Sequence, residues 1–213
     1  GKTAALSLEE VYTVHSLVKN QLGMQIGAWK TSPLSNPAYP FAGPIYRNDI
    51  FASGAKILAS DLFMIGIEGE LAFRFNRDYP TTKKLYTRSQ IIAGISEILP
   101  LIEVVDSRMV DGMNQDPTLK MADNQSNARI IIGPPTKRVC QEIDLTRLPI
   151  TLFKNGTKIY GDVSNNPIKD VGDLGPSLIP SVASKHKRPL SKSLDKVSST
   201  ISAMHISTIR KNS

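Results

Sequence analysis

The chain has 213 residues, 40% of them hydrophobic, which is enough for one globular domain with a sizeable core. It has no apolar run of membrane-spanning length and no signal-peptide core near its start, so we expect a cytoplasmic protein without a membrane partner. The single cysteine excludes an intramolecular disulfide, and the three scattered histidines do not match zinc-finger or zinc-protease spacings.

The formal net charge of +7 lies almost entirely near the C-terminus. Residues 181–213 hold seven Lys and Arg but only one acid, whereas residues 1–180 hold 19 basic and 18 acidic groups. The same C-terminal segment includes nine serines and no aromatic side chain that could stack on bases. We interpret it as a basic, Ser-rich, solvated tail and do not expect a nucleic-acid partner. A tail that binds an anionic partner is the alternative interpretation.

The first predicted elements are a helix and a loop. Ser7-Leu-Glu-Glu10 matches a capping box, and apolar residues then recur near helical spacing, which predicts an amphipathic helix over residues 8–22. Residues 27–44 contain four prolines, which predicts a structured but irregular loop. Trp29 and Lys30 would lie on this loop.

The middle of the chain should alternate between strand and helix. Residues 57–75 are apolar and rich in strand-forming residues, so they predict a long stretch of strand. A second capping box, Thr87-Arg-Ser-Gln90, precedes apolar residues on one helical face, which predicts a helix that stops at Pro100. Residues 101–105 are the next predicted strand.

Strand signals also dominate after a long polar connection. Residues 129–132 predict a short buried strand, and Asn155-Gly156 between two strand-forming runs predicts a hairpin over residues 151–161. The order of the elements indicates an α+β domain dominated by sheet.

Two acidic residues interrupt the apolar run IGIEGELAF, residues 65–73. Alternate residues of a strand face the same side, so Glu68 and Glu70 share one face. A solvent-exposed face would account for this pair alone. Glu103 lies in a second apolar run, LPLIEVV, with no Lys or Arg nearer in sequence than Arg108. If the three carboxylates converge, a hard divalent cation such as Mg²⁺ or Mn²⁺ can compensate their charge.

Several segments together resemble a known family. Residues 65–73, 76–80, 99–108 and 122–126 are similar to the 2-keto-4-pentenoate hydratase branch of the fumarylacetoacetate hydrolase superfamily, and Gly27-Ala-Trp-Lys30 resembles its lysine-bearing segment. The resemblance implies a mixed β-roll of curved sheets with a small helical N-terminal lobe.

The resemblance also implies a division of the chain. We expect the helical lobe and the lysine-bearing loop at residues 1–45, and the metal-binding β-roll at residues 46–180. Residues 181–213 would be a divergent or incomplete tail.

The family resemblance assigns roles to five residues of this chain. The resemblance implies that Glu68, Glu70 and Glu103 ligate one Mg²⁺ or Mn²⁺ ion. Lys30 would be the catalytic group beside the substrate, and Ser126 would lie near the substrate carboxylate.

Arg108 is a further candidate, with two interpretations. It could bind substrate, or it could form a structural salt bridge to Asp106 or Asp111.

The activity implied by the resemblance is that of a hydratase, a lyase of aromatic-compound catabolism. Its substrate would be a 2-oxo or 2-hydroxy-dienoic acid such as 2-hydroxypenta-2,4-dienoate, converted through a metal-stabilised enolate. The family also implies a homo-oligomer.

Two departures from the family keep other activities open. Hydratases of this type often have an aspartate before the glycine that follows the lysine loop, whereas this chain has Pro40-Phe-Ala-Gly43. A decarboxylase or a carbon–carbon hydrolase acting on a related 2-oxo acid is therefore an alternative. The C-terminal segment also lacks the family's late glycines and ends early. A second alternative is therefore a truncated, inactive homologue with exposed sheet edges.

Overall fold

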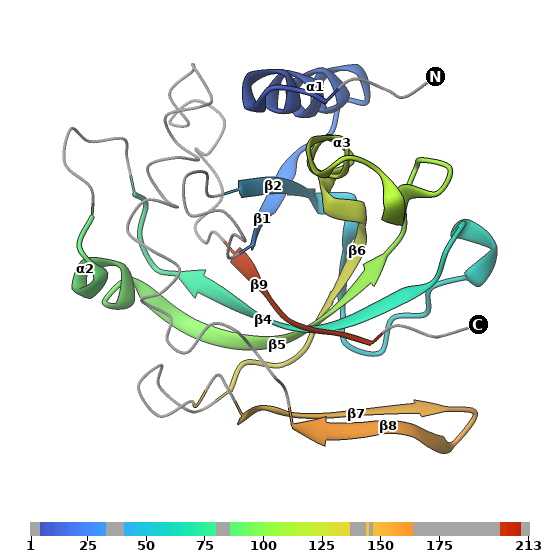
Figure 1. The fold of residues 1–213 in the computed structure, drawn as a ribbon. Coiled ribbons are helices and arrows are strands. Elements are labelled where there is room, and N and C mark those ends of the chain that lie inside the picture. Colours follow the sequence, from blue (N-terminus) through green and yellow to red (C-terminus); the bar gives the residue numbers. More distant parts are fainter. Residues whose placement is uncertain are drawn as a thin grey trace.

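A strongly curved sheet of seven strands forms the body of the structure (Figure 1). The structure is a computed structural model that describes residues 5–32, 41–79, 86–136, 144, 147–163 and 201–209. The strand order in the sheet is β2-β1-β9-β4-β5-β6-β3, and β7 and β8 form a separate hairpin.

The elements have the following bounds. The strands are β1 (Ile26–Ser32), β2 (Phe41–Tyr46), β3 (Ile50–Ala52), β4 (Gly66–Phe75), β5 (Ile95–Val105), β6 (Asn127–Ile132), β7 (Pro149–Lys154), β8 (Thr157–Val163) and β9 (Ile201–Ile209). The α-helices are α1 (Leu8–Gln21), α2 (Arg88–Ile92) and α3 (Pro117–Ala122).

Pairing in the seven-stranded sheet is mixed. β1 pairs with β9, and β3 pairs with β6, in parallel, whereas the other neighbouring strands are antiparallel. The sheet curls on itself, because small and aliphatic side chains of β1 and β2 share one buried cluster with those of β4, β5 and β6. The buried members of this inner cluster are Ala28, Ile45, Ala72, Leu99, Leu101 and Ile130.

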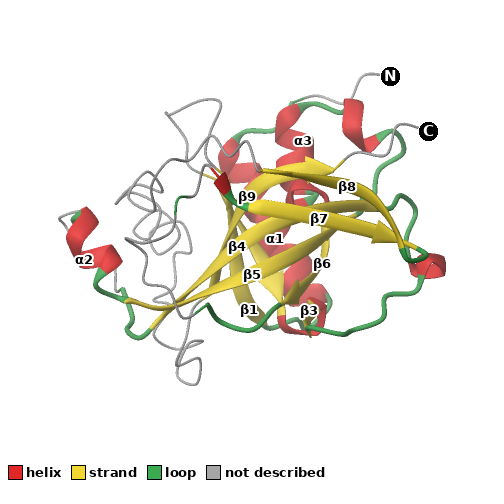
Figure 2. Ribbon diagram, turned by 90° about the horizontal axis from the view of Figure 1, so that it is seen from below, coloured by secondary structure: helices red, strands yellow, loops and turns green. Residues whose placement is uncertain are grey.

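β4 is covered on both faces. Leu71, Phe73 and Phe75 belong to an outer cluster that also contains Ile91 and Ile98, and the β7–β8 hairpin packs against it through Ile150 (Figure 2). Alternate residues of β4 face the inner cluster through Ala72. By the same alternation, the two glutamates of β4 face the inside of the roll.

α1 forms where the capping box predicted it. The Ser7 side chain accepts a hydrogen bond from the Glu10 amide, and the Glu10 carboxylate accepts one from the Ser7 amide at 2.7 Å. The helix ends at Gln21, within one residue of the prediction. It lies beside α3 at one end of the roll (Figure 1), where His15 Nε2 is 2.9 Å from the Met121 carbonyl oxygen.

The predicted loop over residues 27–44 is wrong for much of its length, since β1 and β2 pair there as antiparallel strands. Pro44 is compatible with β2 because this strand lies at the edge of the sheet, where a missing N–H removes no ladder bond on the open side. Lys30 therefore lies on a strand. Residues 33–40 lie outside the described residues.

The second predicted helix is also wrong in length. Its capping box at Thr87 is present, but α2 ends at Ile92, and residues from Ile95 onward form β5, with Pro100 inside the strand. Gly94 follows the helix in close contact with Tyr79, whose hydroxyl would lie 1.9 Å from an added Cβ. The apolar residues after it are buried on both faces of the strand, with Ile98 in the outer cluster and Leu99 in the inner cluster. β4 likewise begins only at Gly66, later than the predicted stretch.

The hairpin prediction is confirmed by β7 and β8, which are joined at Asn155 and Gly156, both with positive φ. The C-terminal segment differs from a solvated tail at residues 201–209, which form β9 between β1 and β4. Residues 164–200 and 210–213, with most of the basic charge, lie outside the described residues. No helix among the described residues is both long and apolar enough to cross a membrane.

Candidate metal centre

Three glutamates from two adjacent strands meet inside the roll. Antiparallel pairing of β4 and β5 sets Glu68 directly opposite Glu103, and Glu70 follows on the same face of β4. One carboxylate oxygen from each lies within 4.8 Å of the others. The residues are 8%, 3% and 0% exposed, so the solvent-exposed face that could have explained the pair on β4 is excluded.

Lys30 reaches the same group of carboxylates from β1. Its Nζ lies 2.6 Å from both Oε1 and Oε2 of Glu103, and the side chains are 5% and 0% exposed. The two residues are 73 positions apart in the chain. Insertion of β9 between β1 and β4, together with the curvature of the sheet, makes this contact possible.

The charges of this group perturb one another. Burial raises the pKa of Glu103 to about 8, although Lys30 opposes the rise. Burial alone would lower the pKa of Lys30, but the negative charges of Glu103, Glu70 and Glu68 outweigh it and raise that pKa. Lys30 is therefore held as an ammonium ion.

Asn127 is a site residue that the sequence did not single out. It is the first residue of β6, it is buried, and its Nδ2 donates to Glu103 Oε1 at 2.9 Å. No local pattern in the sequence distinguishes this asparagine from others, and only the pairing of β5 with β6 brings it beside Glu103.

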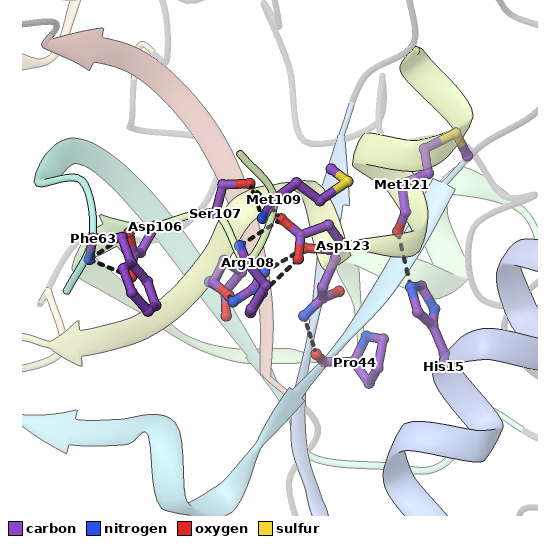
Figure 3. A network of polar contacts seen from close by, with 11 residues as sticks. His15, Pro44, Phe63, Asp106, Ser107, Arg108, Met109, Met121 and Asp123 are labelled. Carbon is purple, nitrogen blue, oxygen red and sulfur yellow. Dashed lines mark hydrogen bonds and ion pairs between the residues drawn. The ribbon is translucent and has the colours of Figure 1, made fainter. Parts of the chain in front are cut away.

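Arg108 is engaged by the protein itself (Figure 3). Its Nε lies 2.5 Å from Asp123 Oδ1, and its Nη1 donates to the Asn127 carbonyl at 2.8 Å. The salt bridge is therefore formed with Asp123 and not with Asp106 or Asp111. Whether Arg108 also binds substrate stays a prediction.

Asp106 and Ser126 have structural contacts of their own. The Asp106 carboxylate accepts hydrogen bonds from the amides of Phe63 and Met64, which anchors the chain just before β4 (Figure 3). Ser126 is buried, and its carbonyl accepts from the Asp106 amide at 2.8 Å. It directly precedes Asn127, but its assignment to the substrate carboxylate remains a prediction.

The residues present fit a hard divalent cation. Three buried carboxylates against one ammonium leave a formal charge of −2 when all are ionised. Oxygen ligands of this kind suit Mg²⁺, Mn²⁺ or Ca²⁺. Among the residues that the structure describes, this is the group of acidic, histidine or cysteine side chains arranged to hold an ion.

Sequence comparison gives relatives of one kind. The chain is 29% identical over 120 residues to 2-keto-4-pentenoate hydratase 2 of Dechloromonas aromatica, a match that spans 56% of this chain and 44% of that enzyme. It is 29% identical over 118 residues to the 2-keto-4-pentenoate hydratase of Burkholderia vietnamiensis, 55% and 43% of the two chains. The resemblance to 2-keto-4-pentenoate hydratases is confirmed. The chain matches less than half the length of these relatives, and no protein-family model matches it.

Comparison with solved structures confirms the fold. 4-Oxalocrotonate decarboxylase from Pseudomonas putida G7, complexed with calcium and acetate, superposes with a TM-score of 0.69 at 21% identity, over 97% of this chain and 79% of that one. The same enzyme complexed with magnesium and adipate superposes with a TM-score of 0.67 at 19% identity, over 100% of this chain and 92% of that one. The sheet-dominated β-roll expected for the 2-keto-4-pentenoate hydratase branch is therefore the fold of this chain.

Proposed function

We propose that this chain is a metal-dependent enzyme, or the metal-binding part of one, that acts on a small 2-oxo or 2-enol carboxylic acid. The observation that carries the proposal is the group of three buried glutamates with Lys30 held on one of them. The names of the curated relatives support this class of substrate. Mg²⁺ or Mn²⁺ is the proposed ion.

The ion's chemistry follows from its ligands. A divalent cation held by Glu68, Glu70 and Glu103 would supply positive charge beside a substrate oxygen on which negative charge develops. The hydrogen-bonded pair β4 and β5 holds all three carboxylates in place. The backbone therefore needs little rearrangement for the carboxylates to bind one ion together.

Lys30 is the proposed acid of the site. The surrounding glutamates raise its pKa and keep it an ammonium ion, which can hold a developing oxyanion. A divalent cation bound to the same glutamates would offset their charge, lower that pKa and make Lys30 a better proton donor to the substrate. It lies on a paired strand, with its side chain buried, and such a residue keeps one orientation. Ser126 is proposed to bind the substrate carboxylate through its hydroxyl.

Hydration of 2-hydroxypenta-2,4-dienoate is the first candidate reaction, from the relatives matched in sequence. Decarboxylation of 4-oxalocrotonate is the second, and one observation favours it. Ala42, which precedes Gly43, is buried in β2 and offers no carboxylate to activate water. A reaction that needs only stabilisation of the enolate would proceed without that group. Hydrolysis of a carbon–carbon bond would still need an activated water.

The test is an assay of both substrates with Mg²⁺, with Mn²⁺ and with a chelator. We expect turnover of one of them that depends on the metal and is lost in Glu70→Gln but not in Glu97→Gln, whose carboxylate pairs with Arg74 in a half-exposed salt bridge. Turnover that survives both chelation and Glu70→Gln would contradict the proposal. Tight metal binding without turnover of either acid would indicate the inactive homologue.

A cytoplasmic location and a homo-oligomer remain predictions. Sedimentation analysis of the purified chain would check the second of these directly.

A further inference from the structure

We infer that Asn127 is a positioning residue of the candidate metal centre, which holds the Glu103 carboxylate in its metal-binding orientation. The inference rests on the proposed metal site and adds to it a residue that contacts a ligand but not the substrate. Residues that hydrogen-bond to metal ligands orient them and commonly tune the affinity of the site.

The contact itself is direct and buried. Asn127 Nδ2 donates to Glu103 Oε1 at 2.9 Å, and the two residues are 5% and 0% exposed. Oε1 thus accepts hydrogen bonds from both Asn127 and Lys30, and Oε2 accepts one from Lys30. The two oxygens are unequal, so the carboxylate is held at one rotation about its last bond.

An unusual backbone segment places Asn127 there. Asn124, Gln125 and Ser126 have φ values of 56°, 52° and 60°, three consecutive non-glycine residues in the left-handed region. L-residues disfavour this region, and such strain persists where the surrounding structure holds it, often beside a functional site. The strained turn ends at Asn127, so it sets where β6 begins and which side chain reaches Glu103.

The polar network around Arg108 holds the strained turn (Figure 3). Arg108 bonds to the Asp123 carboxylate before the turn and to the Asn127 carbonyl after it, so its guanidinium bridges both ends. Asn124 Nδ2 donates to the Pro44 carbonyl at 2.7 Å, which ties the turn to β2. Arg108 therefore acts on Glu103 through Asn127.

The first test compares Mn²⁺ binding to wild type, Asn127→Ala and Asn114→Ala by calorimetry. Asn114 is an exposed asparagine of the same connection, bonded to Asp111, and serves as the matched control. We expect binding about 10- to 100-fold weaker in Asn127→Ala and unchanged in Asn114→Ala. The electron paramagnetic resonance line shape of bound Mn²⁺ should change in Asn127→Ala, which a loss of stability alone would not cause.

The second test keeps the inference falsifiable if Asn127→Ala does not fold. Arg108→Met removes a half-exposed guanidinium, and Arg74→Met removes a comparable salt bridge at the far end of β4. Only Arg108→Met should weaken Mn²⁺ binding, by several-fold.

The outcomes separate the two proposals. Wild type that binds no Mn²⁺ would overturn the proposed function and the inference with it. Wild type that binds Mn²⁺, with Asn127→Ala or Arg108→Met binding as tightly as its control, would overturn only the positioning role of Asn127.

Discussion

Lys30 and the divalent cation proposed for the glutamates are directed at the same carboxylate. The ammonium contacts both oxygens of Glu103, so an ion that takes one of them must share Glu103 with Lys30 or move the lysine aside. Lys30 thus stabilises the protein without metal and opposes metal binding. A residue that only supported a metal ligand would strengthen metal binding, so measurements of metal affinity and of metal-free stability can distinguish the two roles.

Above pH 8, where Glu103 is ionised, replacing Lys30 by methionine should destabilise the metal-free protein by about 3 kcal/mol or more, because the Glu103 carboxylate would lose its buried cationic partner. The same variant should bind Mn²⁺ about tenfold more tightly, since a nearby positive charge is removed. Urea unfolding with a chelator and calorimetry measure the two effects, with Lys56→Met, an exposed lysine, as control. Weaker Mn²⁺ binding in Lys30→Met would contradict the competition.

Glu103 also predicts a pH dependence. Its pKa is about 8 in the folded chain against an ordinary value of 4.5, so the folded state binds more protons than the unfolded state between these values. The stability of the metal-free protein should therefore fall as the pH rises from 4.5 to about 8. Urea midpoints measured across this range with a chelator should decline more steeply in wild type than in Glu103→Gln. Equal slopes in the two proteins would rule out Glu103 as the cause.

At this scale the sequence predicted the carboxylates better than their surroundings. The period of two in β4 placed Glu68 and Glu70 on one face, and the apolar neighbours of Glu103 indicated that it is buried. The contacts of Lys30 and Asn127 with Glu103 depend on the curvature of the sheet and on strands far apart in the chain. No property of neighbouring residues encodes them.

Among the elements, α1 illustrates what local chemistry can specify. Its capping box satisfies amides of the first turn that have no partner within the helix, so its start could be predicted from four residues. α2 begins at an equally good box but lasts only five residues. A cap specifies where a helix starts, whereas its length depends on the tertiary contacts that the following apolar residues make.

The capping box can be tested by Ser7→Ala, which should destabilise the protein by about 1 kcal/mol through loss of the N-cap hydrogen bond. Ser16→Ala, on the same helix, is the matched control. The Ser16 hydroxyl only donates back to the Tyr12 carbonyl, and alanine favours the helix at that position, so we expect little change. Thermal or urea unfolding of both variants provides the comparison. A similar loss in both would show that the N-cap has no special weight.

For the molecule as a whole, β9 is the element that sequence reasoning placed least well. Its composition indicated that the whole of residues 181–213 is a solvated segment. The charge and serine content were counted over all of these residues, of which the structure describes only residues 201–209. Pairing with β1 on one side and β4 on the other decides the structure of this stretch.

Deletion of residues 200–213 should expose the edges of β1 and β4 together with the interior of the roll. We expect aggregation or higher oligomers by size-exclusion chromatography, and loss of Mn²⁺ binding. A deletion of residues 210–213 alone, which leaves β9 intact, is the control. A monodisperse protein with unchanged Mn²⁺ affinity after the longer deletion would restore the interpretation of the segment as a tail.

The position of β9 also bears on the order in which the site forms during synthesis. β1 carries Lys30, and β4 carries Glu68 and Glu70. β9 lies between these two strands in the sheet, and it follows every other described element along the chain. Contacts of such long sequence separation form slowly, and a nascent chain emerges from its N-terminal end. While residues 201–209 are still inside the ribosome, β4 can pair with β5 and β1 can pair with β2, but no strand yet joins β1, which carries Lys30, to β4. The charged centre would thus be completed only after translation of β9.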